Sequence, residues 1–121
     1  MKTRAAGRIP LWLVGLLAAA APAAWAASSW QPTGPMAFGR WAPTATTLPS
    51  GKVLVAGGYD GLQTQATAEL FDPTTGQLRL VGHLPAPVSD AAVAVVGSTA
   101  YLLGGERAPS TPVSTVVQLA A

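Results

Sequence analysis

The sequence predicts an all-β fold, and three observations lead to this prediction. The chain of 121 residues contains 13 glycines and 11 prolines, which favour turns over long helices. Beyond residue 26, no window places apolar residues at the three- and four-residue spacing of an amphipathic helix. Short runs of β-branched and aliphatic residues, each bounded by turn residues, fill this region instead. We therefore expect antiparallel strands joined by tight turns over residues 27–121.

The same region contains an internal repeat with a period of about 47 residues. The run Val53–Gly58, VLVAGG, returns as Ala100–Gly105, AYLLGG, and a turn precedes each copy. Weaker matches at an offset of 48 residues pair residues 69–71 with 117–119, and Trp30, Gly34 and Met36 with Leu78, Gly82 and Leu84. This period, with about four short strands per repeat, is typical of the blades of a β-propeller.

One copy of the repeat is complete. It predicts four strands at Thr44–Leu48, Val53–Ala56, Ala68–Phe71 and Gln77–Val81. The turn DPTTG joins the last two strands. In this turn Pro73 presets a turn φ, Asp72 accepts hydrogen bonds from the following backbone N–H groups, and Gly76 permits a positive φ.

The complete copy also carries a known repeat pattern, in residues 48–61 (LPSGKVLVAGGYDG) and 66–78 (ATAELFDPTTGQL). An apolar strand ends in Gly57-Gly58, a variable loop follows, and Glu69 precedes an aromatic residue and the pair Asp72-Pro73. In these residues the chain resembles a kelch repeat of the galactose-oxidase-like β-propellers. The resemblance implies antiparallel four-stranded kelch-type β-propeller blades.

The resemblance further implies structural roles for the residues of the pattern. The glycine doublets permit unusual φ angles where backbones approach closely. Trp30 is expected to pack between neighbouring sheets, a position that Leu78 takes in the complete copy. Glu69 is expected to be structural rather than catalytic, and to pair with an arginine such as Arg40. The structural repeat residues are Gly57, Gly58, Glu69, Asp72, Gly104, Gly105 and Trp30.

No catalytic, cofactor-binding or metal-binding residue is expected. The chain has no cysteine, which excludes disulfides and thiolate metal sites, and His83 is its one histidine. The copper-radical chemistry of galactose oxidase needs a cysteine and two histidines, so the resemblance does not extend to that activity. His83, Asp90 and Glu106 show no recognised metal-ligand spacing, and no GxSxG motif is present. We therefore expect a protein without enzymatic activity.

Residues 1–26 have the three parts of a secretory signal peptide. The basic start Met1–Arg8 precedes the apolar stretch Leu11–Ala21, Pro22 ends that stretch, and Ala24–Ala26 offers a small-x-small cleavage site. The pattern predicts a signal-peptide helix, cleavage after Ala26 and a secreted, periplasmic or cell-envelope location. The membrane is then met only transiently. An uncleaved membrane anchor is the alternative.

The charge of the chain is divided between these two parts. The whole sequence has an isoelectric point near 9.5, but three of its seven basic residues lie in the first eight positions. Residues 27–121 keep four basic and five acidic residues. The region beyond the signal is therefore close to neutral, and nucleic acid is not an expected partner.

Residues 27–121 provide about two blades, counting an outer strand around Trp30 and about three strands of the second copy. An incomplete propeller of this size indicates either a fragment of a longer protein or a homo-oligomer that closes the ring. We expect an exported, non-catalytic kelch-repeat module that binds a protein or glycan through the loops Tyr59–Thr67 and Glu106–Pro112. The alternative is a carbohydrate-binding lectin formed by oligomerisation of two-blade units, with Trp41 and Arg107 as ligand contacts.

Overall fold

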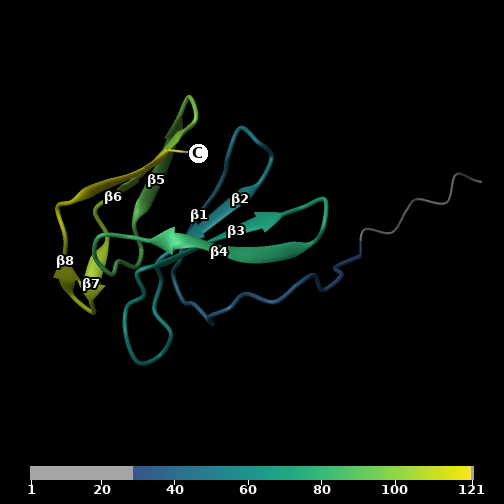
Figure 1. Cartoon of the computed structure of the whole chain (residues 1–121). Helices are drawn as coiled ribbons and strands as arrows, with labels where there is room; N and C mark the ends of the chain where they lie inside the picture. The colour runs from purple at the N-terminus through teal and green to yellow at the C-terminus, as the bar shows by residue number, and fades with distance from the viewer. Residues whose placement is uncertain (1–28, 121) are drawn as a thin grey trace, which may run out of the picture. The chain divides into compact units, whose positions relative to one another are not determined.

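The computed structural model describes residues 29–120 (Figure 1). All the strands described lie in the compact unit Pro32–Ala121. The predicted signal peptide and its cleavage after Ala26 lie outside the described residues. Over the described range, the structure has no helix with the length and apolar character needed to cross a membrane.

The complete sequence copy forms a four-stranded antiparallel sheet, called blade 1. Its strands are β1 (Thr44–Thr47), β2 (Val53–Ala56), β3 (Thr67–Asp72) and β4 (Gln77–His83), hydrogen-bonded in that order. The four predicted strands are therefore confirmed, with ends that differ by no more than two residues. A β-bulge lies in the β3–β4 pair, where Ala68 faces Gly82 and Glu69 faces Leu80.

The second sequence copy forms a three-stranded antiparallel sheet, called blade 2. Its strands are β5 (Ala92–Val96), β6 (Thr99–Leu103) and β9 (Val116–Ala120). A small hairpin of β7 (Glu106–Ala108) and β8 (Thr111–Pro112) lies between β6 and β9. The sequence predicted this segment as a loop, because Pro109 and Pro112 flank runs too short to show a strand period.

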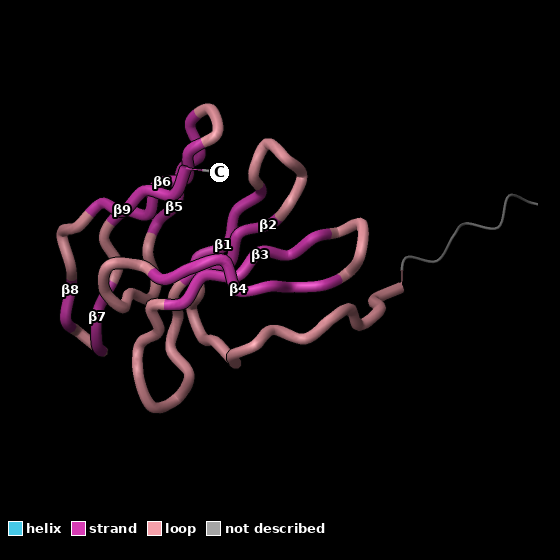
Figure 2. Tube along the Cα trace, viewed as in Figure 1, coloured by secondary structure: helices cyan, strands magenta, loops and turns pink. Residues whose placement is uncertain are grey.

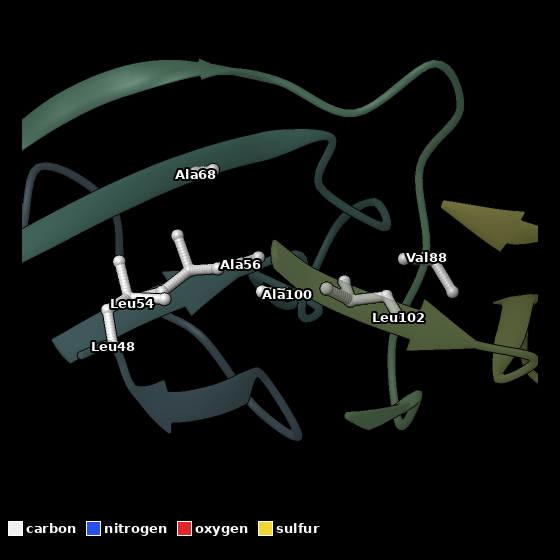
Figure 3. Packing of buried hydrophobic residues seen from close by; sticks show 7 residues of the cluster. All are labelled: Leu48, Leu54, Ala56, Ala68, Val88, Ala100 and Leu102. Atoms are coloured by element: carbon white, nitrogen blue, oxygen red, sulfur yellow. The ribbon is translucent and has the colours of Figure 1, made fainter. Parts of the chain in front are cut away.

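The core lies where the two blades pack together (Figure 3). Leu54 and Ala56 of β2 meet Ala100 and Leu102 of β6, because alternate residues of a strand share one face. A hydrogen bond of 2.9 Å from Thr44 Oγ1 to the Ala91 carbonyl oxygen also links β1 to the residue that precedes β5. The buried apolar residues are Leu48, Leu54, Ala56, Ala68, Val88, Ala100 and Leu102.

The outer strand predicted around Trp30 is not formed. Residues 29–36 have no regular secondary structure, although Gly34 N–H donates to the Gly76 carbonyl oxygen at 2.7 Å. The Trp30 side chain is exposed, and the described residues contain no strand before β1. The packing of Trp30 between neighbouring sheets stays a prediction.

The two glycine doublets adopt nearly the same backbone conformation in both blades. The φ angles are 65° at Gly57 and 66° at Gly104, and 96° at Gly58 and 90° at Gly105. These angles favour glycine, because other residues rarely adopt them. A Cβ atom on Gly57 would also overlap the carbonyl oxygen of Val88. The first doublet therefore turns the chain and also leaves room for the backbone of Val88.

Strand turns and long loops lie at opposite ends of the blades. Figure 2 shows the β1–β2 and β5–β6 turns pointing away from the loop between β2 and β3 and from the hairpin β7–β8. The end that carries this loop and this hairpin is the one onto which the glycine doublets open.

Candidate functional site

A buried ion pair anchors the segment that leads into the site. Arg40 Nη2 lies 2.7 Å from Glu69 Oε2, and both side chains are completely or almost completely buried. The same Arg40 guanidinium donates to the carbonyl oxygens of Gly57 at 2.7 Å and Thr67 at 3.0 Å, and to Thr67 Oγ1 at 2.8 Å. The pair expected from the sequence is thus present, at the centre of a hydrogen-bond network within blade 1.

Glu69 completes this network on its other side. Its Oε1 accepts a hydrogen bond from the Ala37 backbone N–H at 2.7 Å, so both carboxylate oxygens have partners. Within the described residues, no buried side-chain nitrogen or oxygen lacks a hydrogen bond. A buried charge is tolerated only when it is paired and hydrogen-bonded, as here. The role of Glu69 in this structure is therefore to hold residues 37–40 against β3.

Trp41 follows this anchored segment and lies at the loop end of blade 1. Trp41 and Tyr59 exchange two backbone hydrogen bonds, of 2.7 and 2.9 Å. Their rings are tilted by 56° with centroids 5.9 Å apart, and 70% of Trp41 is exposed. An exposed indole fixed in place by backbone pairing is available to a ligand.

A shallow cavity of about 170 Å³ lies beside these two rings. Both blades contribute to it, because the β7–β8 hairpin of blade 2 faces the loop of blade 1. Its lining includes Trp41, Tyr59, Thr64, Ser89, Glu106 and Pro109. Ser89 and Glu106 exchange two backbone hydrogen bonds of 2.9 Å each, which repeats the Trp41–Tyr59 pairing in the second blade.

The Tyr59–Thr67 loop is built around the carboxylate of Asp60. Asp60 Oδ1 accepts hydrogen bonds from the backbone N–H groups of Leu62 and Gln63, each 2.8 Å long, and Oδ2 accepts one from Gln65 Nε2. The N–H groups of Gln63 and then Leu62 lower the pKa of Asp60 below its usual value. The loop that the sequence predicts to be variable is therefore ordered by one aspartate.

The second candidate contact, Arg107, does not join Trp41. Arg107 lines a separate cavity of about 50 Å³ together with Val88 and Val117. The structure thus brings Trp41 to the shared cavity but places Arg107 at a different one. The paired contact expected for a lectin is not assembled.

No metal site is formed from the described residues, which contain no group of three or more His, Asp or Glu side chains able to hold an ion. His83 instead lines an apolar cavity of about 190 Å³ between the blades, beside Leu54 and Leu84. Asp90 is exposed, and its N–H donates to the Ala42 carbonyl oxygen at 2.9 Å. The expectation that the protein has no enzymatic activity stays a prediction.

Sequence reasoning missed most of the cavity lining. Tyr59 was named only as the end of a loop, Glu106 only as the end of a loop and as a residue without metal-ligand spacing, and Ser89 was not singled out. A signal was present, because the 48-residue offset makes Ser89 the counterpart of Trp41. Glu106 follows the second glycine doublet as Tyr59 follows the first, so the same alignment would have paired these two residues.

Comparison with known proteins assigns the repeat. The family described as "Kelch motif" matches residues 40–81, a range that begins at the buried Arg40 and includes most of blade 1. The chain contains a kelch repeat. The four-stranded antiparallel sheet of blade 1 is consistent with a kelch blade.

Two curated relatives share this similarity over a longer stretch. The chain is 33% identical over 78 residues to Kelch-like protein 35 of Mus musculus, and 31% identical over 79 residues to Kelch-like protein 35 of Homo sapiens. These stretches cover 64% and 65% of this chain but only 13% of each relative. The matched part of the chain thus corresponds to a small fraction of either relative.

Proposed function

We propose that this kelch-repeat module binds a protein partner through its loop face. We define the loop face as Trp41 together with the loops Tyr59–Thr67 and Glu106–Pro112. The observation that carries the proposal is the position of Trp41, which is 70% exposed at the edge of a cavity shared by both blades. Tryptophan and tyrosine are the residues most often enriched among the energetic hot spots of protein interfaces.

The order of the loop face supports this function. Asp60 fixes the first loop through three hydrogen bonds, and Glu106 Oε2 accepts one from the Ser110 N–H at 3.1 Å in the second. Loops held in one conformation lose less entropy when they bind, which improves affinity. The Arg40–Glu69 network serves the same end by fixing the chain just before Trp41.

The proposal includes the setting in which binding takes place. The basic start, apolar stretch and cleavage pattern of residues 1–26 support export to a secreted, periplasmic or cell-envelope location. The module itself is non-catalytic in this proposal. The two blades act as part of a propeller, which further blades of a longer protein or second copies of this chain complete.

A random-peptide phage library, selected on the immobilised full chain, tests this function. We expect enriched peptides whose binding falls at least tenfold with Trp41→Ala, because a central hot-spot residue contributes about 2 kcal/mol or more. Val96→Ala is the matched control, since Val96 is 66% exposed on β5 at the opposite end of blade 2. That variant should bind as the parent does.

The loop face would be overturned as a protein-binding site by either of two results. In one, the enriched peptides bind Trp41→Ala as well as the parent; in the other, no peptide is enriched. A glycan array run with the same proteins covers the other ligand class. Binding of a glycan in a Trp41-dependent manner, without any enriched peptide, would replace a protein partner by a carbohydrate.

A further inference from the structure

We propose that the cavity of the loop face receives a lysine or arginine side chain of the bound protein. The inference rests on the proposed function and adds the chemistry of the partner. It identifies the partner as a protein segment that presents a basic residue to this cavity. Three features of the cavity carry it: its aromatic wall, its carboxylate and its lack of a basic residue.

The aromatic wall provides a surface for a cation. Trp41 is the side chain best suited to attract an ammonium or guanidinium group over its ring, and much of it is open to solvent. Tyr59 stands at 56° to it, so the two rings form a corner rather than a flat platform. With their centroids 5.9 Å apart the two rings are in contact, so Tyr59 supports the indole against which a cation would lie.

The carboxylate is that of Glu106, one of the residues that line the same cavity, and its Oε2 is held by the β7–β8 hairpin. Its Oε2 accepts the hydrogen bond from Ser110, while Oε1 accepts no hydrogen bond from the residues that the structure describes. Glu106 is half-buried, so a partner that covers the cavity with apolar groups alone would remove this charge from water. A basic side chain compensates for that loss with a charge-assisted hydrogen bond.

The surrounding charges favour the same occupant. Asp60 and Asp90 are exposed close to the cavity, in the Asp60-centred loop and directly after Ser89. Two arginines are adjacent in sequence to residues of the cavity lining. Arg40, directly before Trp41, is buried against Glu69, and Arg107, directly after Glu106, lines the other cavity. No basic residue is among those that line the Trp41 cavity. Its charge is therefore complementary to a cation and opposed to an acidic segment.

The peptides selected on the full chain provide the first test. We expect lysine or arginine to be enriched at one position of those peptides whose binding depends on Trp41. In a synthetic peptide of that sequence, replacing the basic residue by norleucine should weaken binding about tenfold, as measured by isothermal titration calorimetry. Glu106→Gln should weaken the parent peptide by a similar factor and leave the norleucine peptide almost unchanged.

A matched acidic residue at the far end of blade 1 controls for general charge effects. Asp72→Asn removes one negative charge from the β3–β4 turn and should change the affinity less than twofold. Trp41-dependent peptides without an enriched basic residue would overturn this inference and leave the protein-binding function standing. Equal affinity of the lysine and norleucine peptides would overturn it as well. The absence of any Trp41-dependent peptide would instead refute the proposed function on which the inference rests.

Discussion

The two blades have the same backbone plan but different interiors. The glycine doublets, the paired strand ends and the strand order of the first three strands repeat at offsets of 47 or 48 residues. At the same offset, the buried Arg40 and Glu69 of blade 1 correspond to Val88 and Val117 of blade 2. Turn and glycine positions therefore determine the backbone path of a blade, whereas the residue pair in its interior can be either ionic or apolar.

The two solutions have different physical consequences. In blade 1 the ion pair satisfies four backbone or hydroxyl groups around it, and its removal would leave those groups buried without partners. In blade 2 the valines require no partners, but they leave a cavity of about 50 Å³ beside them. Blade 1 therefore depends on a few strong contacts, whereas blade 2 depends on ordinary apolar packing.

The largest expected effect is a difference in stability loss between alanine substitutions at equivalent positions of the two glycine doublets. Gly57→Ala should abolish the cooperative unfolding transition of the full chain, because its Cβ would overlap the Val88 carbonyl oxygen as well as require a φ of 65°. Gly104→Ala should cost only about 1–2 kcal/mol, since its Cβ would lie 3.5 Å from the Val113 carbonyl oxygen, an ordinary van der Waals contact. Thermal unfolding followed by circular dichroism measures both. Equal losses would show that the doublets are not distinguished by the neighbouring blade.

The next largest effect is a difference in stability loss between substitutions in the interiors of blade 1 and blade 2. Glu69→Gln should lower the free energy of unfolding by about 3–5 kcal/mol, because it leaves the Arg40 charge buried without its counter-ion. The corresponding change in blade 2, Val117→Ala, should cost only about 1–2 kcal/mol for the apolar groups it removes. Urea denaturation of the full chain gives both values. A loss for Glu69→Gln no larger than that for Val117→Ala would contradict the difference between the blades.

A smaller effect is expected at a strained position shared by both blades. Ala42 has a φ of 41° and its counterpart Asp90 a φ of 54°, a region that L residues rarely adopt. Ala42→Gly should stabilise the chain by about 1 kcal/mol, and Asp90→Gly by less, since aspartate tolerates this region better than alanine. Ala45→Gly, within β1, is the control and should destabilise by about 0.5–1 kcal/mol. A loss of stability with Ala42→Gly would refute the strain.

The smallest expected effect is a loss of stability at acidic pH that arises from blade 1. Thr74 and then Lys52 lower the pKa of Asp72 from 3.8 to about 2. A carboxylate whose pKa is lower in the folded state than in the unfolded state stabilises the protein at pH values above its unfolded-state pKa. This contribution is lost as the pH falls from about 4 to about 2. Asp72→Asn should therefore flatten the fall in stability over that interval, as measured by urea denaturation at a series of pH values. An unchanged pH profile would contradict this assignment.

The strands of blade 1 could be predicted because local signals agree there. Turn residues bound each strand, and apolar residues alternate within it, so the strand ends were placed within two residues. Blade 2 offered the same signals for β5 and β6, but the hairpin β7–β8 holds only a few residues around two prolines. Glu106 of this hairpin also pairs with Ser89, which is distant in the sequence and gives no local signal.

The candidate site was predictable only in part, because it is made by residues distant in the sequence. Glu69 could be paired with Arg40 from the resemblance to the kelch repeat. The cavity, in contrast, joins Trp41, Tyr59 and Glu106 from three segments, and only the packing of the two blades brings them together. The packing predicted for Trp30 stays a prediction, since it requires a sheet that the described residues do not contain.

A double-mutant cycle on Arg40 and Glu69 tests the central claim most directly, namely that one buried ionic pair organises blade 1. Arg40→Met, Glu69→Leu and the double variant would be compared with the parent by urea denaturation of the full chain. Each single variant should lose about 3–5 kcal/mol, while the double variant should lose less than the sum by about 2 kcal/mol or more. Simple addition of the two losses would contradict the claim, because it would show that the two side chains act independently.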